Sequence, residues 1–175
     1  MSSVRRLDRI GVQLYTIRDA LTTDLDGSLA RVAAIGYQDV ELAGYRSHSV
    51  AEFKAALDRH GLSAPSTHIA MERVRDELPK VLDEAHQLGH QFVICTNIPD
   101  EKAGLDGYRQ AADLLNHAGE IAGRSGIGIG YHNHESELVP IDGVRPYDVI
   151  LDRTDPKLVA MEMDIFWLVK GGGDP

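Results

Sequence analysis

The stretch Gly126-Ile-Gly-Ile-Gly-Tyr-His-Asn-His-Glu-Ser-Glu137 joins an alternating apolar run to two imidazoles and two carboxylates. A second short apolar run, Leu158-Val-Ala-Met161, is followed by the acidic residues Glu162 and Asp164. Short apolar strands that end in metal-competent side chains are typical of a parallel sheet whose strand ends share a site. The two segments therefore predict neighbouring parallel strands with a common site at their C-terminal ends.

The rest of the chain repeats the same alternation of short apolar strands and amphipathic helices. We predict strands at 10–15, 39–43, 64–69, 92–96, 127–132 and 158–164. We predict helices at 25–34, 49–60, 72–88, 106–124 and 147–152. Ser49 and Glu52 have the spacing of a capping box at the start of the second helix. Continuous apolar strands that alternate with helices indicate a parallel sheet covered by helices.

Repeated strand–helix units fit either a doubly wound open sheet or a (β/α)8 barrel. No glycine-rich phosphate turn follows the first predicted strand, where nucleotide-binding open sheets carry one. Polar side chains instead follow most of the strands; they are Glu41, His68, Thr96, Asn97, His132 and Asp164. Functional side chains at strand ends are typical of a barrel. We therefore predict an α/β fold, a (β/α)8 TIM barrel with about six of its eight units in a single partial domain over residues 1–175.

Composition excludes several classes of protein. The formal charge of −9 argues against a nucleic-acid partner or an anionic membrane surface. No stretch of about eighteen apolar residues and no signal-peptide pattern is found, so we expect no membrane association and a cytoplasmic location. Cys95 is the single cysteine and lies in an apolar run, which predicts a buried structural thiol.

Five segments spread along the chain carry a family resemblance. They are Ile10-Gly-Val-Gln-Leu-Tyr-Thr-Ile-Arg-Asp19, Gly36-Tyr-Gln-Asp-Val-Glu-Leu-Ala-Gly44, Ser66-Thr-His-Ile69, Tyr131-His-Asn-His-Glu135 and Met163-Asp-Ile-Phe-Trp167. In this order they resemble the sugar phosphate isomerase/epimerase family, the xylose-isomerase-like TIM barrels. The resemblance implies one divalent ion, Mn²⁺, Mg²⁺, Co²⁺ or Zn²⁺, at the C-terminal mouth. Its implied ligands are a Glu after strand five, an Asp after strand six, and a His and a carboxylate from the last two strands.

The sequence departs from this family pattern at its end. It stops at Gly171-Gly-Gly-Asp-Pro175, before the strands that would carry the last two ligands. We therefore expect a fragment of a longer reading frame that is inactive by itself. Its first and last strands would be unpaired edges.

The resemblance implies that Asp164 is a metal ligand. The alternative is that Asp164 caps a helix beginning at Ile165. For the strand-five ligand our order is Glu137, then His132, then His134, and the alternatives are structural histidines and a surface glutamate. Strand alternation points His132 and His134 to the same side and Asn133 to the other.

Other strand-end residues are assigned to the substrate. Glu41 is interpreted as an acceptor for a substrate hydroxyl, and His68 as a polar contact or an acid/base group. His132 and His134 are also candidate substrate contacts, and Trp167 either walls the pocket or packs under a helix. The remaining histidines are expected at the surface; they are His48, His60, His86, His90 and His117.

The implied chemistry is proton transfer next to a metal-bound carbonyl. With Glu137 and His68 as acid/base candidates, the predicted function is a metal-dependent isomerase or epimerase of a sugar or keto-sugar. Loss of a hydroxyl would instead give a dehydratase of a keto-sugar or keto-inositol. The charge of −9 argues against an endonuclease for abasic DNA. A non-catalytic barrel fragment is the remaining alternative. The expected partner is a small sugar, and a homo-oligomer is left open.

Overall fold

Six parallel strands form one sheet in the computed structural model, which describes residues 9–98 and 101–175. The strands are β1 (Gly11–Gln13), β2 (Asp39–Ala43), β3 (Ser63–Ile69), β4 (Phe92–Cys95), β5 (Gly128–His132) and β6 (Val159–Glu162). Their order in the sheet is their order in the chain, and every neighbouring pair is parallel. A doubly wound sheet would reverse its strand order at a switch point. The sequential order therefore confirms the prediction of a barrel wall of six units.

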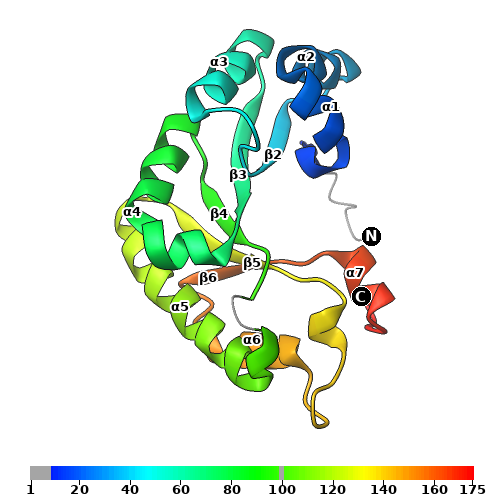
Figure 1. Ribbon diagram of the computed structural model, residues 1–175, viewed down its shortest axis with the longest axis vertical. Coiled ribbons are helices and arrows are strands. Elements are labelled where there is room, and N and C mark those ends of the chain that lie inside the picture. The colour runs from blue at the N-terminus through cyan, green and yellow to red at the C-terminus, as the bar shows by residue number, and fades with distance from the viewer. Residues whose placement is uncertain (1–8, 99–100) are drawn as a thin grey trace, which may run out of the picture.

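Helices connect successive strands, and the longer ones cover the outer side of the sheet (Figure 1). The connecting helices are α1 (Arg18–Thr23), α2 (Leu25–Ile35), α3 (Val50–His60), α4 (Met71–Leu88), α5 (Leu105–Arg124) and α6 (Pro146–Arg153). A further helix, α7 (Ile165–Lys170), follows β6. Short 3₁₀ turns lie at Leu14–Ile17, Glu101–Ala103 and Ser136–Leu138. The five predicted helices are confirmed with small shifts of their ends. α1 was not predicted from the sequence.

Local sequence signals set the helix ends. Ser49 and Glu52 form the predicted capping box, in which each side chain accepts a hydrogen bond from the other residue's backbone N–H. Gly61 ends the same helix with a φ of 65°, a left-handed conformation that favours glycine. In α4, the backbone is non-helical at Glu77, just before Pro79. Proline cannot donate the next helical hydrogen bond, which accounts for the kink.

The sheet is strongly curved, and the side chains on its inner face demonstrate the curvature. Strands lie about 4.8 Å apart, so in a flat sheet β3 and β6 would be separated by about 14 Å. Nevertheless His68 at the end of β3 lies 2.8 Å from Glu162 at the end of β6. The sheet therefore wraps around a common interior, as a barrel wall does, and brings the ends of distant strands together.

Apolar side chains of the sheet's outer face pack against the helices. Val93, Cys95 and Ile129 are buried there with the inner faces of α4 and α5. The prediction for Cys95 is confirmed, and burial raises the pKa of its thiol to about 12. The expectation of a surface position is wrong for His90, which is 3% exposed and whose Nδ1 lies 2.5 Å from the carbonyl oxygen of Ala64.

The inner face has room for large side chains where β5 carries glycine. A Cβ added to Gly130 would lie 2.5 Å from the side chain of Ile94 on β4. A Cβ on Gly128 would similarly lie 2.5 Å from the ring of Phe92. The alternating glycines of the opening stretch therefore make space for the apolar residues of β4, beneath the polar strand ends.

The sheet has two open edges within the described residues. β1 pairs only with β2, and β6 pairs only with β5. Beside β6, the short helix α7 leaves Ile165, Phe166 and Val169 more than half exposed. In the part of the chain that the structure describes, no helix combines the length and apolar character needed to cross a membrane.

Candidate active site

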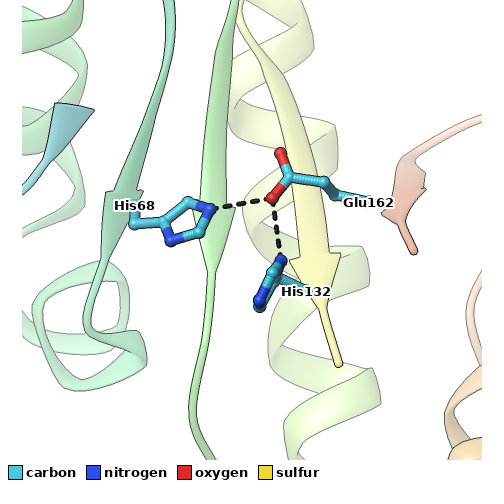
Figure 2. A group of neighbouring side chains, drawn as sticks. All are labelled: His68, His132 and Glu162. Atoms are coloured by element: carbon cyan, nitrogen blue, oxygen red, sulfur yellow. Dashed lines mark hydrogen bonds and ion pairs between the residues drawn. The ribbon is translucent and has the colours of Figure 1, made fainter. Parts of the chain in front are cut away.

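Two histidines and a glutamate converge at the C-terminal ends of three strands. One carboxylate oxygen of Glu162, Oε1, lies 2.8 Å from Nε2 of His68 and 2.9 Å from Nδ1 of His132 (Figure 2). These three atoms all lie within 4.8 Å of one another. The strands β3, β5 and β6 therefore contribute one potential ligand atom each to a single small volume.

His68 is held on two sides. Its Nε2 also lies 2.9 Å from Oε1 of Glu41, and its Nδ1 lies 3.1 Å from Nε2 of Gln13. The second oxygen of Glu41 accepts a hydrogen bond of 2.6 Å from Ser66. The side chains of β1 and β2 thus fix the orientation of the imidazole on β3.

The charges of the cluster shift the pKa values of its members. Burial by itself would lower the pKa of His68, but the hydrogen bonds and charges of Glu162 and Glu41 outweigh burial and raise it to about 9. Burial would raise the pKa of Glu162, but the hydrogen bonds from His132 and His68 hold it far below its usual range. Without a metal ion, the cluster therefore stores a proton on His68 beside an ionised Glu162.

Asp164 follows β6 and is fixed from three directions. Its Oδ1 accepts a hydrogen bond of 3.0 Å from the backbone N–H of Trp167, so Asp164 does cap α7. Its backbone pairs with the side chain of Asn133, which is fully buried. Its Oδ2 lies 3.8 Å from Nε2 of His132. The cap uses only one carboxylate oxygen, which leaves the other facing His132.

His132 separates two sets of ligand atoms. Nδ1 of its ring faces Glu162 and His68, whereas Nε2 faces Asp164. The two nitrogens of one imidazole point away from each other, so one ion can bind only one of them. An ion bound to His132 would therefore lie either with Glu162 or with Asp164.

Glu137 is turned away from this cluster. Its Oε1 accepts a hydrogen bond of 2.6 Å from the hydroxyl of Tyr131. Its Oε2 accepts from the hydroxyl of Ser136 at 2.8 Å and from the backbone N–H of His134 at 3.2 Å. Glu137 as a whole is 3% exposed. In the structure, Glu137 holds the loop that carries His134, and its roles as ligand and base stay predictions.

A cavity of about 960 Å³ opens above the cluster at the C-terminal ends of the strands. Its walls include His68, His132, His134, Asp164 and Trp167. The rings of His134 and Trp167 lie 5.6 Å apart, and the ammonium of Lys170 lies 4.4 Å from the centre of the indole. Trp167 is therefore part of the cavity wall. His132 and His134 lie on the same side of the chain, as strand alternation predicted.

The convergent group has the chemistry of a divalent metal site. Two imidazole nitrogens and a carboxylate oxygen suit Zn²⁺, Mn²⁺ or Co²⁺. Neighbouring ligands on an octahedral ion lie about 3.0 Å apart when the bonds are about 2.1 Å long. The separations of 2.8 Å and 2.9 Å from Glu162 to the two rings come close to that spacing. The residues present thus fit such an ion once the ring protons that face Glu162 are released.

Two residues of the cluster had no role in the site predicted from the sequence. They are Gln13 and Glu162. Glu162 stands two positions before Asp164 in a strand, so alternation alone places both on the same face. That signal could have identified Glu162 as a candidate.

The sequential parallel sheet and the polar site at its C-terminal strand ends define the β/α-barrel class. The chain belongs to the xylose isomerase-like TIM barrel family, which it matches over residues 29–175. It is 22% identical over 168 residues to an inosose dehydratase of Bacillus cereus, a match that covers 84% of this chain and 56% of the relative. The chain thus spans about half the length of the curated relatives it matches.

Solved structures give the same fold. A sugar phosphate isomerase/epimerase from Parabacteroides distasonis is 28% identical with a TM-score of 0.83, covering 99% of this chain and 71% of the other. The IolI protein with a bound zinc atom is 14% identical with a TM-score of 0.69, covering 95% of this chain and 66% of the other. The second likeness bears on the fold alone.

Proposed function

We propose that this protein is a metal-dependent isomerase or epimerase that acts on a sugar or keto-sugar by proton transfer next to a carbonyl. The observation that carries the proposal is the convergence of His68, His132 and Glu162 beneath a cavity at the strand ends. Support also comes from the name of a similar protein of known structure, a sugar phosphate isomerase/epimerase.

His68, His132 and Glu162 would hold the ion. This position for the ion is favoured over one beside Asp164. Three ligand atoms lie together at His68, His132 and Glu162, whereas Asp164 faces only His132. A bound divalent ion supplies positive charge that stabilises the anion formed when a proton leaves the carbon next to a carbonyl. Gln13 would keep the imidazole of His68 in place through Nδ1, the ring nitrogen that does not face Glu162.

Asp164 would move the proton. Its Oδ2 is free of the helix cap, borders the cavity and lies beside the ring of His132. Oδ2 would take a proton from the hydroxyl-bearing carbon next to the carbonyl and return it to the former carbonyl carbon. The proton of that hydroxyl would pass to the former carbonyl oxygen, which completes an aldose–ketose isomerisation. Return of a proton on the opposite face by a second group would give epimerisation. His134 and Trp167 would bind the sugar ring or chain.

The test combines metal binding with hydrogen exchange. The metal-stripped chain is titrated with Mn²⁺ by calorimetry and then incubated with keto-sugars in D₂O, and NMR follows the proton next to the carbonyl. We expect saturable binding and metal-dependent loss of the proton signal. Glu135→Gln is the matched control, because Glu135 lies near the site but pairs with Lys170 at the surface. A chain that binds no Mn²⁺, or that exchanges equally without it, would contradict the proposal.

Dehydration is the second candidate, because the curated relatives are inosose dehydratases. Removal of the same proton, followed by departure of the hydroxyl on the next carbon as water, would give an unsaturated ketone. Its ultraviolet absorbance distinguishes dehydration from isomerisation in the same assay.

A further inference from the structure

Two arginines contact the ring of Tyr15 at the edge of the cavity, and neither has a carboxylate partner in the described residues. The guanidinium carbon of Arg18 lies 4.5 Å from the centre of the Tyr15 ring, and that of Arg46 lies 5.5 Å from the same centre. Tyr15 and Arg46 both line the cavity. Within residues 9–98 and 101–175, no ion pair involves either guanidinium. The cavity therefore has a positively charged edge.

Arginines without an ion pair are a minority among the described residues. The chain has 27 acidic and 18 basic residues, so carboxylates are in excess. Most arginines in the described residues are accordingly paired with one; they are Arg9, Arg59, Arg73, Arg75, Arg109, Arg145 and Arg153. Arg18 donates a hydrogen bond of 3.0 Å to the carbonyl oxygen of Tyr15, but no carboxylate of the described residues neutralises it or Arg46, and a bound anion would supply the missing negative charge.

The backbone holds Arg46 at this place. Its φ of 50° is in the left-handed region, which is uncommon for a residue other than glycine. The turn is closed by a hydrogen bond of 2.9 Å from the N–H of His48 to the carbonyl of Tyr45. The ring of His48 lies 2.9 Å from the carbonyl oxygen of Leu21, so the turn is tied to α1. Arg46 is therefore presented by an anchored turn.

Arg73 also lines the cavity, but it is already neutralised. Its guanidinium pairs with Glu77 at 3.3 Å and with Glu84 at 3.1 Å. The arginine available to a ligand in the cavity is thus Arg46, supported by Arg18 at the same aromatic ring. Arginine recognises carboxylate and phosphate groups through its planar set of N–H donors.

We propose that Arg46, with Arg18, binds a carboxylate or phosphate group of the substrate. The inference rests on the proposed function, in which the sugar occupies this cavity with its carbonyl at His68 and His132. The substrate is then an acidic sugar that carries its anionic group away from the reacting carbonyl. A neutral sugar of the same size would lack this contact.

The test measures binding without catalysis. Trp167 is the only tryptophan and lines the same cavity, so its fluorescence reports binding to the metal-free chain. The probes are D-glucuronate, D-glucose 6-phosphate and neutral D-glucose, and the first two distinguish carboxylate from phosphate. We expect at least one acidic sugar to bind about tenfold more tightly than glucose. We expect this preference to weaken in 0.5 M KCl, because salt screens exposed charges.

Arg46→Gln should abolish the preference for the acidic sugar. Arg124→Gln is the matched control, since Arg124 is exposed at the end of α5 and does not line the cavity. Equal binding of all three sugars, or a preference that survives Arg46→Gln or is insensitive to salt, would overturn the proposal. Preferential binding without any hydrogen exchange would instead retire the proposed reaction and leave the anion site standing. Hydrogen exchange on neutral keto-sugars, without tighter binding of any acidic sugar, would instead retire the anion site and leave the proposed reaction standing.

Discussion

The side-chain amide of Asn133, just past the end of β5, pairs with both backbone polar groups of Asp164, just past the end of β6. Oδ1 of Asn133 accepts a hydrogen bond of 2.9 Å from the N–H of Asp164, and Nδ2 donates one of 3.3 Å to its carbonyl. The amide thus imitates one further step of the ladder between the two strands. Its effect is to fix Asp164 relative to His132, the neighbour of Asn133 in the chain.

Asn133→Ala is expected to lower the free energy of unfolding by about 1–3 kcal/mol, because it leaves two backbone groups of Asp164 without partners. Urea denaturation measures this change. Hydrogen exchange into the keto-sugar should also fall, since Oδ2 of Asp164 loses its fixed position.

Asn116 offers a matched control for that variant. It makes the same double contact with backbone, donating to the carbonyl of Arg153 and accepting from the N–H of Asp155, but on the outer side of α5. Asn116→Ala should lower stability and leave exchange per folded molecule unchanged. Equal losses of exchange in both variants would mean that Asn133 has no positioning role.

Glu162→Gln is expected to weaken Mn²⁺ binding at least about 100-fold, because it replaces the carboxylate that faces both imidazoles. Glu137→Gln should leave Mn²⁺ affinity within about threefold and instead destabilise the fold by about 1–3 kcal/mol, since its buried oxygens accept three hydrogen bonds. Calorimetry and urea denaturation of the same two proteins measure both quantities. Loss of binding in Glu137→Gln alone would favour the ligand order expected from the sequence.

The elements of the fold were accessible from the sequence because they depend on local signals. Apolar runs gave each strand to within a few residues, and the pair Ser49 and Glu52 marked the start of α3. Side-chain alternation also predicted correctly that His132 and His134 share a side. These features depend only on residues that lie close together in the sequence, so local sequence patterns are enough to predict them.

The contacts of the site were not accessible in the same way. His68 and Glu162 are 94 positions apart and meet only because the sheet curves, a property of packing and not of either strand. The turned-in position of Glu137 depends on the hydroxyl of Tyr131, which an apolar strand pattern treats as a core residue. The surface position expected for His90 was wrong because its ring contacts the backbone of Ala64 in β3, which lies 26 positions earlier in the chain.

The stability of the metal-free chain is expected to fall as the pH rises from about 6.5 to 9. The pKa of His68 is about 9 in the folded chain and 6.5 ordinarily, so the folded state favours the protonated ring. This contribution is fully present below pH 6.5 and is lost as the pH rises through 9. Urea denaturation across this pH range measures how the free energy of unfolding changes with pH. His68→Gln should remove the part of this slope that His68 causes. An unchanged slope in that variant would show that His68 is not the group responsible.

The same proton competes with a metal ion for Nε2 of His68. Mn²⁺ affinity should therefore increase by about tenfold per pH unit between pH 7 and 9, as expected for one displaced proton. Titrations at several pH values test this. Affinity that does not change with pH would place the ion away from His68.

Asp164→Asn and Asp164→Ala together separate the roles of this residue. Asparagine is a good helix cap, so Asp164→Asn should keep the free energy of unfolding within about 0.5 kcal/mol, whereas Asp164→Ala should lose about 1 kcal/mol with the contact to Trp167. If the ion binds at Glu162, Asp164→Asn keeps Mn²⁺ affinity within about threefold but lowers hydrogen exchange at least about 100-fold, because an amide cannot take the proton. If instead Asp164→Asn loses Mn²⁺ affinity while Glu162→Gln keeps it, the ion lies on the Nε2 side of His132. The proton must then be carried by a group other than Asp164.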